Sequence, residues 1–270
     1  MSCTYELNSP FNFWLGVVEN TIYTSKPELK VSCAACNLSK LCVTNGLNHD
    51  ELVDFEKIVS LSSRFEKDQA LYRSGDSLKG IYAVRSGSFK GMVSDADGNL
   101  HITGFYTPGD IIGFDGLGDQ RYQCDIVAMD ESRVCEMPID RLDHLCEEFP
   151  ALQYEMRSIG SRNQNSLQHL LMLVGKRPVE ERLAVFLLNY VEKYRGRGLA
   201  CDQLHLPMSR HEIANYLAMA PETLSRQFKR FKKDGWIKMN NKYCTILNEA
   251  ALKELAHYCG AGDGERLKAG

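Results

Sequence analysis

Hydrophobic and polar positions follow two different patterns along this chain, and the change of pattern divides it into regions. Between residues 64 and 138, short runs rich in β-branched and aromatic residues are separated by turns that contain glycine. Turns at such close spacing are typical of an antiparallel sandwich or barrel. The runs expected to form strands are residues 70–73, 80–85, 88–93, 101–106, 123–129 and 133–137.

Apolar residues recur at helical spacing on both sides of this region. Residues 52–59 predict a short helix, with Asn48 or Asp50 as its cap. From Pro150 an apolar stripe predicts one helix that ends before Pro178, followed by a second helix over residues 179–194. The first of these would be about 40 Å long, which suits an exposed dimer seam better than a buried core. The residues expected in that seam are Met156, Ile159, Leu167, Leu170, Leu171 and Val174.

The C-terminal region predicts a helix-turn-helix. Ser209 is a good N-cap, and Glu212 three residues later completes a capping box. After a short turn, Pro221 starts a second helix, since proline is preorganised for the first helical position. Residues 235–247 then predict a small wing of strands, and residues 250–257 a terminal helix.

The second helix is rich in Lys and Arg, whereas the chain as a whole is slightly acidic. The whole sequence carries 32 Lys and Arg against 35 Asp and Glu, so any surface for nucleic acid must be local. In the helix-turn-helix motif, the N-terminal part of the second helix enters the major groove of DNA. Arginine pairs with guanine, glutamate accepts from cytosine, and serine is permissive. We therefore expect DNA to be bound by Glu222, Ser225, Arg226, Lys229 and Arg230.

Length and composition narrow the remaining choices. A chain of 270 residues suggests two domains, and its ten cysteines are too scattered for a disulfide scaffold, so a reducing cytoplasm is expected. No apolar run approaches a membrane span, and we do not identify a signal peptide. Neither a glycine-rich dinucleotide loop nor a catalytic triad is evident, so we do not expect an enzyme.

One stretch stands apart for its chemistry, because it holds three thiols within ten residues. Cys33, Cys36 and Cys42 follow a C-x2-C-x5-C pattern, which lets a short loop curl around one soft metal centre. Disulfides fit least well, since the number of thiols is odd. Structural zinc usually uses two paired clusters, whereas an iron–sulfur cluster would need one distant cysteine. Spacing alone leaves zinc and the cluster open.

The order of sandwich, long helix and helix-turn-helix resembles the cyclic-AMP receptor protein (CRP/FNR) superfamily. The three-thiol loop, together with the segment Glu222-Thr-Leu-Ser-Arg226, resembles the oxygen-sensing, FNR-type branch of that superfamily. The resemblance extends from about residue 33 to residue 250. Further supporting stretches are residues 82–87, 102–105, 109–110, 134–138, 180–183 and 213–217.

The resemblance implies a [4Fe-4S] cluster whose ligands are Cys33, Cys36, Cys42 and, by the motif around residues 134–138, Cys135. It also implies that the intact cluster favours a homodimer, which binds a palindrome of the form TTGAT…ATCAA, and that oxygen removes the cluster and lowers this affinity. Regulators of this branch touch RNA polymerase through sandwich hairpins, and the acidic turn 94–98 matches such a surface.

Two further expectations concern departures from related patterns. In this branch an acidic residue interrupts the dimer stripe, whereas this chain has Leu167 there, so we expect it to dimerise more readily without its cluster. The run 113–122 lacks the glutamate and the Arg-Ser/Thr pair that grip a cyclic nucleotide, so none is expected to bind.

The predicted fold class is α+β, with an antiparallel β-sandwich or jelly-roll sensor domain, a long dimerisation helix and a winged helix-turn-helix. The expected boundaries are an N-terminal extension at 1–32, the thiol loop and sensor at 33–149, the dimerisation helix at 150–177 and the DNA-binding domain at 178–270.

Overall fold

The computed structural model describes residues 32–61, 64–198 and 203–257. The expected N-terminal extension, 1–32, therefore lies outside the described residues except for its last position. The N-terminal half is a sandwich of two four-stranded antiparallel sheets, so the predicted antiparallel class is confirmed. Six of its eight strands correspond to the expected runs, whereas the two-residue strands at 60–61 and 111–112 were not predicted. One sheet has the order β1 (Ser60–Leu61), β8 (Arg133–Pro138), β3 (Gly80–Ser86), β6 (Ile111–Ile112). The other has the order β2 (Ala70–Tyr72), β7 (Asp125–Ala128), β4 (Phe89–Ser94), β5 (Leu100–Tyr106).

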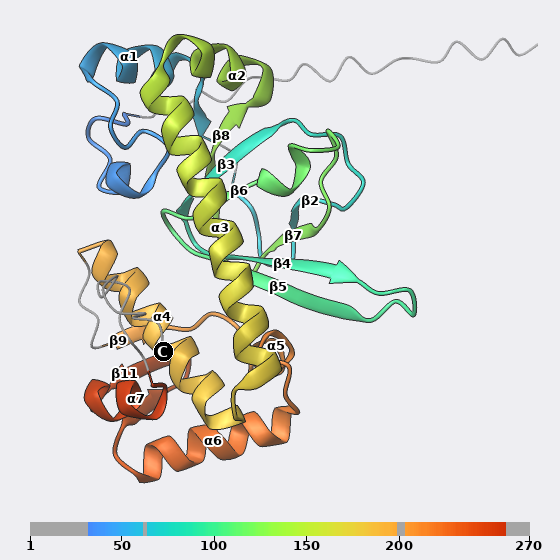
Figure 1. Cartoon of the computed structure of the whole chain (residues 1–270), viewed down its shortest axis with the longest axis vertical. Coiled ribbons are helices and arrows are strands. Elements are labelled where there is room, and N and C mark those ends of the chain that lie inside the picture. The colour runs from blue at the N-terminus through green and yellow to red at the C-terminus, as the bar shows by residue number, and fades with distance from the viewer. Residues whose placement is uncertain (1–31, 62–63, 199–202, 258–270) are drawn as a thin grey trace, which may run out of the picture.

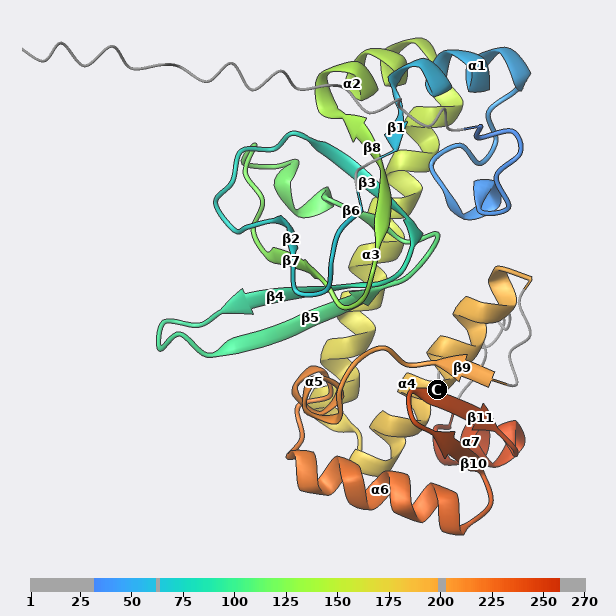
Figure 2. The same ribbon diagram turned by 180° about the vertical axis from the view of Figure 1, so that it is seen from behind.

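The β4–β5 hairpin is closed by the predicted turn. Gly98 adopts a φ of 82°, which a glycine tolerates without a side-chain clash. Asp95 accepts hydrogen bonds from the backbone N–H groups of Asp97 and Asn99, which fixes the loop. The hairpin projects from the sandwich beside the C-terminal half (Figures 1 and 2).

Helices cover one end of the sandwich. A capping box between Asn48 and Glu51 starts α1 (His49–Ile58), so Asn48 rather than Asp50 is the cap. A helix that was not predicted, α2 (Ile139–Glu148), follows β8 directly and buries Ile139, Leu142 and Leu145. It leads into α3 (Pro150–Lys176), the single long helix expected from the apolar stripe.

The C-terminal half is a winged helix-turn-helix, and its core also includes Phe105 and Met129 of the sandwich. Its elements are α4 (Val179–Gly196), β9 (Gln203–His205), α5 (Arg210–Tyr216), α6 (Pro221–Lys233), β10 (Ile237–Asn240), β11 (Tyr243–Ile246) and α7 (Glu249–Leu255). Leu187, Ile213 and Phe231 lie in one buried cluster that joins α4, α5 and α6. This half lies at the opposite end of the molecule from α1 and α2 (Figure 1).

The two halves contact each other through the hairpin and α5. The Asn215 side chain accepts from the Ile102 backbone at 2.7 Å and donates to the Leu100 carbonyl at 2.9 Å. Lys90 of β4 forms a 2.6 Å ion pair with Glu212, the same residue that completes the capping box of α5. The start of α5 is therefore held by the sandwich as well as by its own cap.

The long helix leaves part of its apolar surface uncovered. Tyr154, Leu167, Leu171 and Met172 are each more than half exposed. Apolar side chains gathered on one helix in this way mark an interaction surface. Among the helices of the described residues, none is both long and apolar enough to cross a membrane.

Candidate metal centre and nucleic-acid interface

The thiol loop is a chain of tight turns. The backbone N–H of Cys36 donates to the Cys33 carbonyl at 3.1 Å, and that of Cys42 donates to the Leu38 carbonyl at 3.1 Å. A single helical turn, η1 (Ser39–Leu41), lies between the second and third thiols. Glu56 of α1 accepts from the backbone N–H of Cys33, which anchors the start of the loop. These hydrogen bonds keep the loop compact, and all three thiols lie near one end of the sandwich.

The fourth predicted thiol comes from a rigid strand. Cys135 lies on β8, paired with Leu61 of β1 on one side and Ala83 of β3 on the other. This pairing places Cys135 against the thiol loop, and a single pocket is lined by Cys33, Cys36, Cys42 and Cys135. Its other walls are mainly apolar, with Leu38, Phe55, Val59, Val84 and Met137 among them.

The remaining described thiols lie elsewhere. Cys124 is buried between the sheets and donates to Asp115 at 3.2 Å, while Cys146 lies on α2 and Cys244 on β11. None of these three lines the thiol pocket. The structure thus places around one pocket the three thiols of the loop and the fourth that the family resemblance implied, and it leaves these others apart.

Burial dominates the acid–base behaviour of the pocket. It raises the pKa of Cys33 to about 12 and that of Cys135 to about 11, with neighbouring thiols adding to the rise. Burial also raises the pKa of Cys42. At neutral pH these groups are therefore protonated in this arrangement, and a metal that binds thiolate sulfur must displace their protons.

The donors of the pocket fit a sulfur-ligated group. Four cysteine thiols are the usual ligand set of a [4Fe-4S] cluster, and three of the four here sit on one short loop. The cavity between the loop and the strand measures about 30 Å³. Among the described residues, no three His, Cys, Asp or Glu side chains lie close enough to hold a single metal ion.

The second candidate site is the exposed face of α6. A capping box between Ser209 and Glu212 starts α5, and Pro221 occupies the first turn of α6, both as predicted. Between the two helices Ala218 has a φ of 49°, a left-handed conformation that completes the tight turn. Leu224, Phe228 and Phe231 bury the inner face of α6, which leaves its polar face in solvent.

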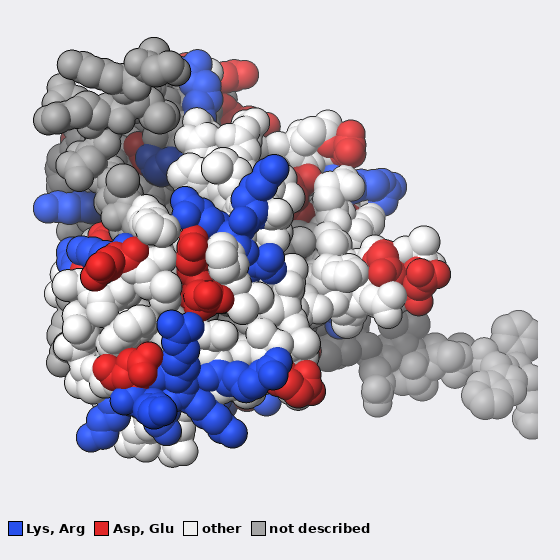
Figure 3. Space-filling model, turned by 60° about the horizontal axis from the view of Figure 1, so that its bottom comes forward, with Lys and Arg blue, Asp and Glu red and all other residues white. Residues whose placement is uncertain are grey.

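The five residues expected to read DNA all lie on that polar face. Glu222, Arg226, Lys229 and Arg230 are exposed and Ser225 is half-buried. Figure 3 shows Lys and Arg side chains gathered at the end of the molecule where α6 lies, and Lys232 and Lys233 extend this basic surface.

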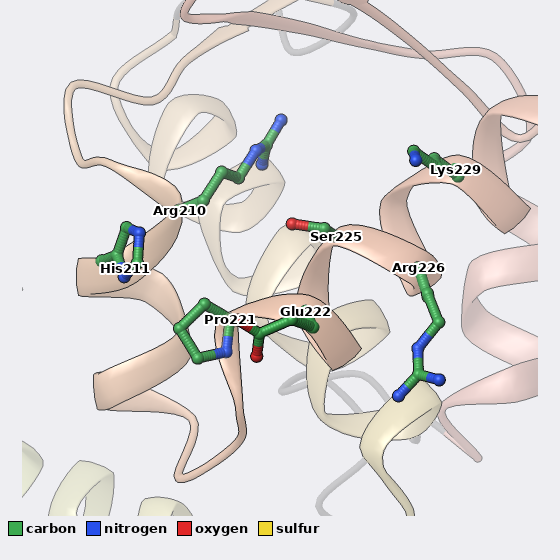
Figure 4. Close-up of a pocket in the computed structure, with 7 residues that line it drawn as sticks. All are labelled: Arg210, His211, Pro221, Glu222, Ser225, Arg226 and Lys229. Carbon is green, nitrogen blue, oxygen red and sulfur yellow. The ribbon is translucent and has the colours of Figure 1, made fainter.

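A shallow hollow of about 380 Å³ lies between α5 and α6. Figure 4 shows Arg210 and His211 of α5 on one side of it, opposite Glu222, Ser225 and Lys229 of α6. The Arg210 guanidinium stacks 3.4 Å from the centre of the Phe228 ring, a cation–π contact that fixes its orientation. Sequence reasoning did not single out Arg210, although a basic residue directly after an N-cap was a usable signal.

The predicted dimer residues divide into two groups along α3. Ile159 is buried against the chain's own sandwich, and Met156 is packed against the same cluster. Leu170 and Val174 are half-buried, whereas Leu167 and Leu171 are 52% and 69% exposed. Only the C-terminal half of the stripe is therefore free to meet a partner in this arrangement.

Each half of the chain matches a known protein family. Residues 62–149 match the model of the cyclic nucleotide-binding domain, and residues 181–255 match the Crp-like helix-turn-helix domain. The chain is 37% identical to the fumarate and nitrate reduction regulatory protein of Escherichia coli over 226 residues, which cover 84% of this chain and 90% of that protein. The chain belongs to the CRP/FNR family. It is a DNA-binding transcriptional regulator and not an enzyme.

One further relative and two solved structures extend this comparison. The fumarate and nitrate reduction regulatory protein of Yersinia pestis is 36% identical over the same share of both chains. FixK2 from Bradyrhizobium japonicum has a TM-score of 0.69 at 20% identity, covering 75% of this chain and all of that one. A CooA mutant from Carboxydothermus hydrogenoformans has a TM-score of 0.61 at 20% identity, covering 82% and 96%. These structures share the fold of the chain.

Proposed function

We propose that this regulator responds to oxygen through a [4Fe-4S] cluster held by Cys33, Cys36, Cys42 and Cys135. The observation that carries the proposal is the position of Cys135, which spacing alone could not select. Because β8 pairs with β1 and β3, Cys135 lines the same pocket as the three thiols of the loop. When bound, the cluster supplies an oxygen-sensitive tie between the loop and the strand.

The thiol loop contacts the long helix on one side. The Asn45 side chain lies 3.5 Å from the carboxylate of Glu155 on α3. Glu155 is buried and pairs with Arg162 at 2.8 Å, about two turns further along the helix. Any movement of the loop on binding the cluster would shift this contact, and the helix that it touches also presents Leu167 and Leu171 for dimerisation.

A second contact leads from the loop to the DNA-binding half. Leu38 and Leu41 pack closely against Gly109, in the turn before β6. Asp110 of that turn forms a 2.7 Å ion pair with Lys193 of α4, and Arg197 donates to Thr107. The state of the loop can therefore bias the placement of α4 as well as the dimer helix.

The homodimer gives this coupling its effect on DNA. Two recognition helices about 34 Å apart would meet successive major grooves of a palindrome of the TTGAT…ATCAA form. Arg226 and Glu222 would read base edges, while Lys229 and Arg230 would contact phosphates. Losing the dimer removes half of these contacts from each binding event, so affinity falls steeply.

Cyclic nucleotide does not enter this scheme, despite the name of the matched domain. Arg121, the candidate for gripping a phosphate, instead donates to the Gly75 carbonyl at 2.7 Å. Between the sheets, the Tyr72 and Tyr122 rings stack 3.6 Å apart, and Asp115 accepts from the Tyr72 hydroxyl. Aromatic side chains thus occupy the interior of the sandwich.

The hairpin tip at residues 94–98 is proposed to meet RNA polymerase. Asp95 is held by Asn99 and His101, and these hydrogen bonds lower its pKa to about 2, so it stays charged under all physiological conditions. The tip projects away from α6 (Figure 1), which leaves it accessible when the recognition helix is on DNA.

The test is anaerobic reconstitution with iron and sulfide, followed by DNA binding before and after exposure to air. We expect iron and sulfide in the protein, dimers on the palindrome without oxygen, and weaker binding after the cluster is lost. Zinc in place of iron, with binding that air does not change, would support the alternative of a cluster-independent family member. Iron with oxygen-independent DNA binding would indicate an electron carrier or a structural cluster.

A further inference from the structure

Arg85 brings a positive charge into the thiol pocket. It lies near the end of β3, is half-buried, and its Nη1 is within hydrogen-bond distance of the Cys36 Sγ. It also lowers the pKa of Cys135, against the larger rise that burial causes. The guanidinium therefore faces thiols from both the loop and the strand.

Arg85 has no carboxylate partner among the described residues. Within the part of the chain that the structure describes, Arg85 forms no ion pair with a carboxylate. Among the residues that line the thiol pocket, it is the one Lys or Arg. Burying a cation costs free energy when no carboxylate pairs with it, unless another group compensates its charge.

The proposed cluster has the opposite imbalance. Four thiolates outweigh the positive charge of a [4Fe-4S] core, so the occupied pocket would carry net negative charge between apolar walls. Arginine stays charged at all accessible pH values and can donate several hydrogen bonds. Donors to cluster sulfurs and nearby positive charge stabilise the reduced form and raise the reduction potential.

We propose that Arg85 is a positioning residue of the cluster site, which donates to the Cys36 sulfur and compensates the charge of the occupied pocket. This inference rests on the proposed function, because it assigns Arg85 a role toward the same cluster. It predicts that Arg85 sets how tightly the cluster is held and at what potential it is reduced, with no direct role in reading DNA.

The test compares Arg85→Gln and Arg85→Lys with the wild type. A matched control is Arg133→Gln, which removes the same charge from the neighbouring strand, at a position paired with Ser86 but outside the thiol pocket. After anaerobic reconstitution, the rate of iron loss to a chelator and the midpoint potential of the cluster are measured. Thermal unfolding of the cluster-free proteins reports whether each variant folds.

We expect Arg85→Gln to lose iron at least about tenfold faster than the wild type, as is usual when an outer-shell partner of a metal ligand is removed. Its midpoint potential should be lower, Arg85→Lys should fall between the two, and Arg133→Gln should match the wild type. Should Arg85→Gln fail to fold, the Lys variant decides the matter through the same two measurements.

Two results would overturn the inference, and they differ in scope. A wild type that binds iron while Arg85→Gln and Arg133→Gln both match it in iron loss and potential refutes the role of Arg85 alone. A wild type that takes up no iron and sulfide refutes the proposed function, and the role of Arg85 with it.

Discussion

The thiol loop and helix α6 lie far apart in this protein (Figure 1), and the thiol pocket and the recognition surface are assembled in different ways. The recognition surface belongs to one local unit: a capping box, a tight turn and a buried helix face hold α6 in place. The thiol pocket joins a loop near the N-terminus to strand β8, and its enclosed volume is small. One surface is formed within a single helix-turn-helix and lies open to solvent, whereas the other exists only where a loop and a distant strand meet.

This difference indicates which parts of the protein the proposed cluster can affect. The core of the DNA-binding half does not include the thiol loop, so loss of a cluster would leave α6 folded. What the loop touches is Glu155 on the dimer helix and the turn at Gly109. Oxygen should therefore alter the number and placement of the recognition helices, and leave their internal structure unchanged.

The largest effect is expected from Cys135→Ser, because it removes the one ligand that ties the loop to the sandwich. Anaerobically reconstituted protein should lose most of its iron and sulfide, and DNA affinity should fall by about 5- to 150-fold, the usual range of coupling between two sites. Cys124→Ser is the control, since Cys124 lies between the sheets. Equal iron content in the two variants would contradict the role of Cys135 as a cluster ligand.

At the other end, Arg226→Ala should weaken binding to the palindrome by about 1–3 kcal/mol and relax base preference at one position of each half-site. Lys229→Ala is the matched variant: it should weaken binding to all sequences alike and reduce the salt dependence by about one unit of slope. Titrations of matched and mismatched DNA at several salt concentrations distinguish the two. Cluster content should be unchanged in both, which tests whether the two ends are independent.

Between the two ends, Leu167→Asp probes the exposed part of the dimer helix. Leu167 is 52% exposed, and two acidic side chains brought together across a dimer would repel each other. In this partly solvated position we expect the dissociation constant of the cluster-free dimer to rise about tenfold, as measured by analytical ultracentrifugation. Equal monomer fractions for the cluster-free wild type and the variant would remove the idea that Leu167 favours dimerisation without the cluster.

Sequence reasoning predicted the recognition end more completely than the sensor end, and the reason is physical. The signals at Ser209, Glu212 and Pro221 act within one or two helical turns, so they can be read without knowing the fold. Six of the eight sandwich strands and the long helix were predicted because their patterns also lie within one segment of the chain; the two-residue strands at 60–61 and 111–112 are too short to show a pattern. Helix α2 was missed although Ile139, Leu142 and Leu145 recur every three residues, because it directly continues a strand.

The sensor pocket depends on pairing between distant segments. The pairing of Cys135 with Ala83 fixes which face of β8 it presents, and spacing along the chain holds no such information. Cys135 was identified through family resemblance, and Arg85 was not identified at all, because a basic residue near a strand end has no distinctive pattern. Predicting either from physics would have required the strand register first.

The smallest effect on the thiol pocket and on DNA binding is expected at Asp110, which joins the turn beside the thiol loop to α4; its change is measured in stability. Burial raises the pKa of this carboxyl, but the ion pair with Lys193, the nearby Arg197 and the hydrogen bond from Thr107 outweigh it and leave the pKa lowered. A lowered pKa means that the ionised carboxylate stabilises the folded state fully above its ordinary pKa of about 3.9, and that this contribution is lost as the pH falls through the folded-state value.

Asp110→Asn should therefore lower the free energy of unfolding at pH 7 by about 1.5–3 kcal/mol, the range for hydrogen bonds to charged groups. The deficit should shrink as the pH falls below about 4, because the wild-type carboxyl then becomes neutral as well. Denaturant titrations from pH 7 to pH 3 measure this, with Asp97→Asn at the exposed hairpin tip as the control. A deficit that stays constant with pH would mean that the Asp110 charge does not hold the turn to α4. The contact from the thiol loop would then end at Gly109, and the dimer helix would remain as the route between the two ends.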